Sequence, residues 1–417
     1  MRHDQRAVSA PAERLAADTS GRVLSPARPA TRTLSASARD ADADAATPHI
    51  RIRPHPAARR ARSGDRVFRS ILVTGGAGFI GSAFVRNLLR ADPEVTVTVL
   101  DKLTYAGNPA NLAPCEADPG QARRFRLVVG DIADPLAVAP LVAAADAVVN
   151  FAAESHVDRS IQDPTAFLRT GVIGVHVLLE AVRRADHPVR FLQVSTDEVY
   201  GEVPEGASTE DDPLRPRSPY AAAKAAGDLL VQSYVVTHGI DAVITRGANT
   251  YGPYQYPEKV VPLFVTNAID ELALPLYGDG LQRRDWLHVD DHAAAIGLVL
   301  RRGEKGGVYN VPGAVELPNL ELTRRILAEL GRSEALIRHV ADRPGHDRRY
   351  HVDGARIAAL GWSAQVPMED GLAATVRWYR EHPEWWRPLK AGEWRGYYAR
   401  QYGARLAGST PHEPGTP

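Results

Sequence analysis

The chain has 417 residues, and its 50 lysines and arginines balance 50 aspartates and glutamates. This zero net charge argues against a protein that binds nucleic acid or a membrane surface through a basic field. A single cysteine, Cys115, excludes a disulfide framework and a cysteine-based zinc site. Apolar residues make up 44% of the chain, and no run of about 18 uncharged apolar residues occurs, so we expect a soluble, cytoplasmic protein without a transmembrane helix.

Both ends of the chain differ in composition from the middle. Residues 1–67 are rich in Arg, Ala, Pro and Ser and have almost no periodic apolar residues, so we expect a disordered N-terminal extension. Acidic residues at 40, 42 and 44 disfavour an organellar transit peptide. Residues 404–417 are expected to form a disordered tail.

Between these ends, short apolar runs alternate with helical stretches as far as about residue 250. This alternation predicts an α/β fold with a Rossmann-type, doubly wound parallel sheet over 68–250, to which later segments return. A smaller C-terminal lobe is expected mainly over 251–390. The expected strands are 67–74, 95–101, 125–130, 146–151, 189–196, 241–246, 274–277 and 307–311. The expected helices are 79–90, 163–185, 218–237, 290–302, 318–331 and 369–381.

A glycine-rich turn, residues 74–81, follows the first strand and opens the first helix. Glycines at such a turn let a pyrophosphate approach the helix N-terminus closely. Asp101 closes the second strand at the offset from Gly81 where a carboxylate can bind the adenosine ribose and would repel a 2′-phosphate. The spacing predicts that the first domain binds NAD rather than NADP, with Asp131 and Ile132 near the adenine.

Ser218 and Pro219 begin a helix that carries Tyr220 and Lys224 on one face. An ammonium beside a phenol favours the phenolate, so Tyr220 is expected to serve as a base near neutral pH. Lys224 can also hold the nicotinamide ribose. Together with Ser195 and Thr196, which close the fifth strand, this pair resembles the signature of the extended short-chain dehydrogenase/reductase superfamily.

Two adjacent carboxylates, Asp197 and Glu198, follow the fifth strand, where ligands bind in doubly wound folds. An epimerization at C4 needs only the hydroxyl, the tyrosine and the lysine. An elimination also needs one carboxyl to remove a carbon-bound proton and another to protonate the departing hydroxyl. The pair therefore favours an elimination.

The chain resembles the dTDP-glucose 4,6-dehydratase family over essentially all of residues 68–390. The matching segments are DKLTYAGN (101–108), AAESHVDRSI (152–161), STDEVYG (195–201), SPYAAAKA (218–225), YGPYQYPEKVVPLF (251–264), LPLYGDG (274–280), RDWLHVDDH (284–292) and DRPGHDRRY (342–350).

The resemblance implies a mechanism on tightly bound NAD⁺ that is regenerated in each turnover. Tyr220 would accept the proton of the glucosyl 4-hydroxyl, with Thr196 hydrogen-bonded to the same oxygen. Glu198 would remove the C5 proton, and a protonated Asp197, its pKa raised by the neighbouring Glu198, would protonate the departing 6-hydroxyl. The substrate would be dTDP-glucose, and the product dTDP-4-keto-6-deoxyglucose would feed deoxysugar biosynthesis.

The same resemblance assigns the binding residues. Besides Tyr220 and Lys224, the cofactor set is Gly75, Gly78, Phe79, Ile80, Gly81, Asp101, Lys102, Leu103, Thr104, Asp131, Ile132, Ala152, Ala153, Ser155 and Thr170. The substrate set is Ser155, Thr196, Asn249, Lys259, Val260, Pro275, Tyr277, Arg284, Asn319, Asp342, Arg343 and His346. His288 and His292 lie four residues apart without an evident third ligand, so no metal site is expected.

The chain departs from the family pattern near the cofactor. Gly171 and Thr250 replace asparagines that the family usually has, and Gly247 and Ala248 replace its usual residues. The alternatives are a UDP-glucose 4,6-dehydratase, a 4-epimerase, a UDP-glucuronate decarboxylase, or a non-catalytic NAD-binding scaffold. The family pairs through helices such as 163–185 and 218–237, which implies a homodimer.

Overall fold

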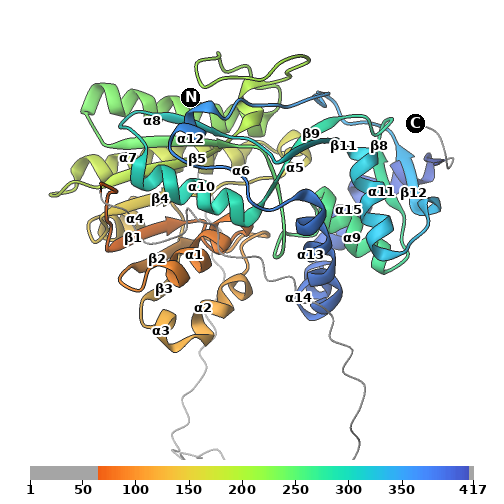
Figure 1. Ribbon diagram of the computed structural model, residues 1–417, viewed down its shortest axis with the longest axis horizontal. Helices are drawn as coiled ribbons and strands as arrows, with labels where there is room; N and C mark the ends of the chain where they lie inside the picture. The colour runs from red at the N-terminus through yellow and green to blue at the C-terminus, as the bar shows by residue number, and fades with distance from the viewer. Residues whose placement is uncertain (1–63, 413–417) are drawn as a thin grey trace, which may run out of the picture. The chain divides into compact units, whose positions relative to one another are not determined.

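The computed structural model describes residues 64–412. Its centre is a seven-stranded, all-parallel sheet with the strand order β3-β2-β1-β4-β5-β6-β10 (Figure 1). The predicted doubly wound sheet is therefore confirmed. The strands are β1 (Ser70–Thr74), β2 (Thr96–Asp101), β3 (Phe125–Val129), β4 (Ala147–Asn150), β5 (Arg190–Thr196), β6 (Ala242–Gly247) and β10 (Val308–Val311).

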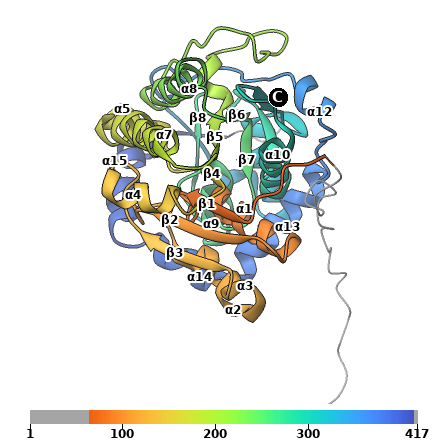
Figure 2. The same cartoon turned by 90° about the vertical axis from the view of Figure 1, so that its left-hand side faces the viewer.

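Helices cover both faces of this sheet because its strands are apolar on both sides (Figure 2). On one face, α1 (Phe79–Ala91) packs with α10 (Val289–Arg302) and α12 (Ala355–Ala359). On the other face, α4 (Pro135–Val142), α7 (Val175–Arg184) and α8 (Pro219–His238) form a second layer. Short elements line the connections: η2 (Pro109–Leu112), α2 (Ala113–Ala117), α3 (Pro119–Ala122), α5 (Val157–Gln162) and η4 (Asp197–Tyr200).

A second apolar cluster lies among the later elements. Two three-stranded sheets, β11-β9-β7 and β13-β12-β8, help to form this lobe. Its strands are β7 (Asn249–Tyr251), β8 (Leu274–Tyr277), β9 (Arg283–His288), β11 (Val315–Pro318), β12 (Ile337–Val340) and β13 (Thr410–Pro411). Its helices are α9 (Val260–Ile269), α11 (Asn319–Leu330), η5 (Glu334–Leu336), α13 (Met368–Glu381), α14 (Pro383–Leu389) and α15 (Glu393–Ala407).

The predicted helix 163–185 is a helical stretch of three parts: α6 (Thr165–Leu168), the π-helical η3 (Arg169–Gly174) and α7. Gly171 lies in η3, where a Cβ atom would come within 3.2 Å of Ala223 Cβ on α8. Among the described residues, the stretch 165–184 has the length and hydropathy of a membrane-crossing helix, although α7 also packs on the sheet. The expected lack of a transmembrane helix therefore stays a prediction.

The predicted disorder is wrong where the structure describes the ends. In the N-terminal extension, residues 1–63 lie outside the described part, but Arg302 Nε donates to Asp65 Oδ1 at 2.6 Å. In the tail, α15 continues to Ala407 and β13 pairs with β12, because bulky side chains such as Tyr402 pack into the second cluster. Only residues 413–417 of the predicted tail lie outside the described part.

Candidate functional site

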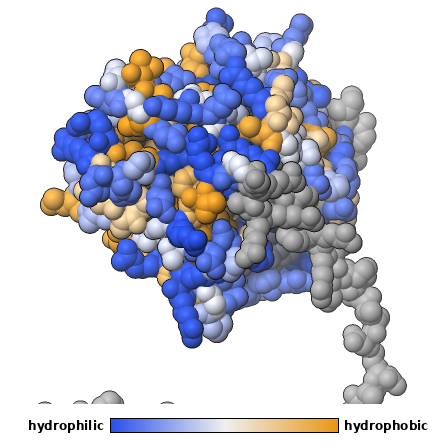
Figure 3. Space-filling model, turned by 60° about the vertical axis from the view of Figure 1, so that its left-hand side comes forward, coloured by the Kyte–Doolittle hydropathy of each residue, from blue (hydrophilic) through white to orange (hydrophobic). Residues whose placement is uncertain are grey.

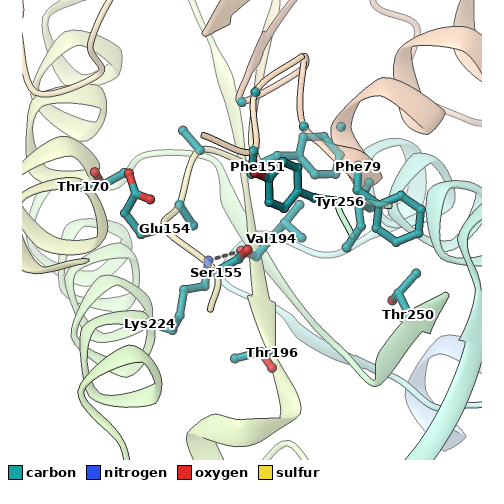
Figure 4. A pocket seen from close by; sticks show the side chains of 18 of the residues that line it. Phe79, Phe151, Glu154, Ser155, Thr170, Val194, Thr196, Lys224, Thr250 and Tyr256 are labelled. Atoms are coloured by element: carbon teal, nitrogen blue, oxygen red, sulfur yellow. Dashed lines mark hydrogen bonds between the residues drawn. The ribbon is translucent and has the colours of Figure 1, made fainter. Parts of the chain in front are cut away.

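A cavity of about 280 Å³ lies at the carboxyl ends of the parallel strands (Figure 4). Its wall comes from the turn after β1, the ends of β2 and β3, the loop after β4, the end of β5, the start of α8 and the segment 247–259. The predicted residues in this wall are Gly75, Gly78, Phe79, Ile80, Gly81, Asp101, Lys102, Thr104, Asp131, Ile132, Ala152, Ala153, Ser155, Thr170, Thr196, Asp197, Glu198, Tyr220, Lys224, Asn249 and Lys259.

The turn after β1 admits no side chains at two of its glycines. Gly75 has φ +68°, and a Cβ atom there would lie 2.5 Å from the backbone nitrogen of Ala152. A Cβ atom on Gly81 would lie 2.4 Å from the carbonyl oxygen of Gly75. Helix α1 begins after Gly78 without a side-chain cap, so a ligand can reach its first N–H groups. The turn suits a phosphate group.

Asp101 lies at the end of β2, beside this turn. Its carboxylate accepts hydrogen bonds from the N–H of Ala77 at 2.9 Å and of Leu103 at 2.8 Å, although burial raises its pKa. These bonds fix the carboxylate at the cavity wall, where it can accept from a ribose hydroxyl. Leu103 reaches Asp101 only through its backbone and does not line the cavity. Lys102 pairs with Asp131 at 2.9 Å on the adjoining strand end.

The two adjacent carboxylates begin η4 directly after β5. Thr196 caps this turn: its hydroxyl accepts from the N–H of Glu198 at 3.3 Å and donates to Asp197 Oδ1 at 3.1 Å. Burial, with the charges of Glu198 and Asp285, raises the pKa of Asp197 to about 8. At neutral pH Asp197 is therefore protonated, as a general acid must be.

Glu198 differs from its neighbour in the charges around it. Burial raises its pKa, but the guanidinium groups of Arg343 and Arg284 oppose that rise. Two similar carboxyl groups in different surroundings can take opposite proton-transfer roles.

Tyr220 and Lys224 reach the cavity from the first two turns of α8, which begins at the N-cap Ser218. The predicted role of Tyr220 as a base near neutral pH stays a prediction. Burial and the charges of Glu198 and Asp197 raise the pKa of Tyr220, and only a hydrogen bond with Thr196 opposes them. Lys224 instead donates to the carbonyl of Val194 at 2.5 Å, and burial lowers its own pKa to about 8 (Figure 4).

The substrate-binding prediction divides into two groups. Ser155, Thr196, Asn249 and Lys259 line the cavity, and Lys259 Nζ donates to the carbonyl of Ser155. The others do not line it: Val260, Pro275, Tyr277, Arg284, Asn319, Asp342, Arg343 and His346.

Several residues outside the cavity wall pair with one another, and all but Asp158 on α5 belong to the second lobe. Asp158 accepts from Tyr277 at 2.9 Å and from Arg343 at 3.3 Å, and His346 pairs with Asp342 at 2.6 Å. Arg284 is 5% exposed and donates to the carbonyl of Asp347 at 2.9 Å. Because Arg284 and Arg343 act on the pKa of Glu198, this cluster adjoins the carboxylate end of the cavity.

The cavity has further polar walls that the sequence analysis did not single out. Glu154, Tyr256 and Glu258 are three of these residues, and they lie in the segments that resemble the family. Those segments could therefore have identified them. Thr250 and His292, which the sequence analysis named only as a departure from the family pattern and as part of a histidine pair, also line it, joined by a 2.8 Å contact between the hydroxyl and Nδ1. They are 42 residues apart in sequence, and the pairing of β7 with β9, which α10 directly follows, brings their segments together.

One cluster among the described residues has the side-chain types of a metal site: Asp285, Glu316 and His351. The sequence analysis did not identify it. These groups are already paired, since His351 Nδ1 lies 2.8 Å from Asp285 and Arg349 donates to Glu316 at 2.8 Å.

The chain is similar to several known proteins. The sequence profile of a family described as GDP-mannose 4,6 dehydratase matches residues 72–375. A dTDP-glucose 4,6-dehydratase of Streptomyces niveus is 54% identical over 327 residues, which cover 77% of this chain and 96% of the relative. The solved dTDP-glucose 4,6-dehydratase DesIV of Streptomyces venezuelae, with NAD bound, is 54% identical with a TM-score of 0.74, and the match covers 77% of this chain and 100% of that one. A UDP-glucose 4-epimerase of Thermus thermophilus in complex with NAD is 32% identical with a TM-score of 0.69, over 75% of this chain and 99% of that one.

Proposed function

The chain belongs to the dTDP-glucose 4,6-dehydratase family, and we propose that it converts dTDP-glucose to dTDP-4-keto-6-deoxyglucose with the loss of water. The observation that carries this proposal is the carboxyl pair of buried Asp197 and half-buried Glu198, which lines the same cavity as Tyr220 and Lys224. The related 4-epimerase reaction needs no second carboxyl, so the pair favours dehydration over epimerization.

The cofactor is NAD⁺, held by residues of the segment 68–250. The glycine turn admits a pyrophosphate because neither Gly75 nor Gly81 has room for a side chain. Asp101 offers its carboxylate to the adenosine ribose and would repel a 2′-phosphate. When bound there, NAD⁺ would supply the acceptor for a hydride from the sugar and would return that hydride within the same turnover.

Three side chains divide the proton transfers, and Thr196 assists the first of them. Tyr220 accepts the proton of the sugar 4-hydroxyl, and Thr196 hydrogen-bonds that oxygen. Burial and the charges of Glu198 and Asp197 raise the pKa of this phenol, so a positive charge bound beside it would be needed to lower that pKa.

With a ketone at C4, the C5 proton becomes acidic and Glu198 removes it. Asp197, protonated at neutral pH, gives its proton to the 6-hydroxyl, which leaves as water. The hydride taken from C4 would then return to C6, and a proton would return to C5, which gives the 4-keto-6-deoxy sugar.

The second lobe, mainly 251–390, holds the nucleotide diphosphate. Arg284 and Arg343 are guanidinium groups next to the carboxylate end of the cavity, and a guanidinium can bind phosphate oxygens in a bidentate manner. In the structure Arg343 pairs with Asp158, so we expect a diphosphate to compete with this carboxylate for the guanidinium.

We further propose a cytoplasmic homodimer that pairs through α5 to α8. Large apolar side chains on these helices remain exposed: Ile161, Leu168, Ile173, Leu229 and Val236. In Figure 3 the left-hand side of Figure 1 is turned forward, and this side shows separate hydrophobic groups among hydrophilic ones. A second copy would cover them.

The proposed function is tested with purified protein and either dTDP-glucose or UDP-glucose, without added NAD. The product is measured as the ultraviolet absorbance of a 4-keto-6-deoxysugar in alkali. We expect product from dTDP-glucose. Product from UDP-glucose alone would contradict the proposed substrate. No product from either nucleotide sugar, even after NAD is added, would contradict the proposed dehydratase activity.

A further inference from the structure

Asp228 continues the row of active-site residues on α8. Tyr220, Lys224 and Asp228 follow at intervals of four residues and therefore share one face of the helix. Asp228 is fully buried, and its carboxylate accepts a hydrogen bond from Arg246 Nε on β6 at 2.9 Å. A buried carboxylate thus stands one helical turn behind the active-site lysine.

Arg246 makes a second side-chain hydrogen bond, through a nitrogen other than the one that contacts Asp228. It is 1% exposed, and its Nη1 donates to the hydroxyl of Tyr200 at 2.7 Å. That hydroxyl donates in turn to Asn310 Oδ1 at 2.8 Å, on β10. The network links α8, β6, η4 and β10, so the position of the Asp228 carboxylate is fixed by several elements.

Lys224 needs such support because it is buried. Its ammonium donates to the carbonyl of Val194, which is a neutral partner. Burial disfavours the charged ammonium, and the charge of Asp228 is the group that opposes this effect. The other titratable groups of this end of the cavity are Tyr220 on α8, Asp197 and Glu198 on η4, and Glu154 after β4.

We propose that Asp228, held by Arg246, is a positioning residue that keeps the Lys224 ammonium charged and directed into the active site. This inference rests on the proposed function in one respect, the role of Lys224 in the active site. A purely structural ion pair would join α8 to the sheet but would leave the protonation of Lys224 unchanged.

The chain has only five lysines, so the charge state of Lys224 can be measured directly. Lysines labelled with ¹³C at Cε are followed by NMR between pH 6 and 11, and Lys224→Arg identifies the Lys224 signal by its disappearance. We expect Asp228→Asn to lower the proton affinity of Lys224 about tenfold or more, because the opposing charge is lost. The alkaline limb of kcat should move to lower pH in the same variant.

Asp228→Asn leaves a buried guanidinium unpaired, which can prevent folding. The double variant Asp228→Asn/Arg246→Met removes both charges and should give the same direction of change. The matched control is Tyr200→Phe, which removes a bond of Arg246 on the side away from Lys224. It should lower the melting temperature and leave the Lys224 titration unchanged.

An unchanged Lys224 titration in both Asp228 variants would overturn the proposal, as would an equal shift in Tyr200→Phe. If the wild-type protein fails to dehydrate dTDP-glucose, the proposed function fails instead, while the titration still decides the role of Asp228.

Discussion

Asp197 has two oxygen atoms in different surroundings. Oδ1 accepts from Thr196, whereas Oδ2 is buried and has no hydrogen-bond partner among the described residues. A carboxyl group in this setting holds a proton, and the cost of ionising it is the desolvation that raises its pKa.

We expect Asp197→Asn to lower kcat for dehydration by about 10² to 10⁴, the usual contribution of a general acid. Oxidation at C4 should persist, because it needs Tyr220 and not Asp197. The measurement is the absorbance of reduced cofactor at 340 nm alongside product formation. Asp279→Asn, which removes an exposed carboxylate paired with Arg348, is the matched control and should retain wild-type kcat. Equal losses in both variants would contradict the assignment.

Activity should fall as the pH rises through about 8. The acid form of Asp197 is the active form, and its pKa of about 8 means that the proton is lost above that pH. Lys224, also with a pKa of about 8, loses its charge over the same range, so both effects have the same sign. The measurement is kcat against pH with saturating substrate, and a profile that stays flat to pH 10 would contradict this expectation.

At the scale of elements, the turn between β1 and α1 leaves little freedom for substitution. We expect Gly81→Ala to reduce bound NAD at least tenfold, because its Cβ atom would meet the carbonyl oxygen of Gly75 at 2.4 Å. The measurement is the NAD content of the purified protein. Gly396→Ala, in α15, is the control, since its Cβ atom would meet only the end of the flexible Arg400 side chain, at 3.3 Å. Equal NAD content in both variants would show that the turn does not hold the cofactor.

Elements were easier to predict than contacts. The strand 274–277 was predicted with its observed bounds, and α1 within one residue, because apolar periodicity and a glycine turn are local signals. The tail 404–412 was missed because its order depends on packing against distant aromatic residues. The raised pKa of Tyr220 could not be predicted from its own helix either, since it depends on burial and on two carboxylates that a different element, η4, brings to the cavity.

At the scale of the whole molecule, we expect Leu229→Glu to convert the proposed dimer to a monomer. Leu229 is 55% exposed on α8, and a carboxylate there would be desolvated in a helix-to-helix interface. Leu272→Glu is the matched control, because Leu272 is 50% exposed but follows α9 in the other lobe. Mass by light scattering distinguishes the two variants, and a Leu229→Glu protein that keeps the wild-type mass would place the interface elsewhere.

Strand β10 pairs with β6 although three strands and two helices, β7 to α10, lie between them along the chain. During synthesis, the backbone groups of β6 that pair with β10 therefore have no partner strand until Val311 has left the ribosome. We expect a ribosome-bound chain that has emerged only as far as Thr250 to remain sensitive to protease. A chain that has emerged as far as Leu330 should be resistant over the parallel sheet. The nucleotide-binding half of this protein is thus completed late in translation, by a strand that the chain supplies after it has begun the other half.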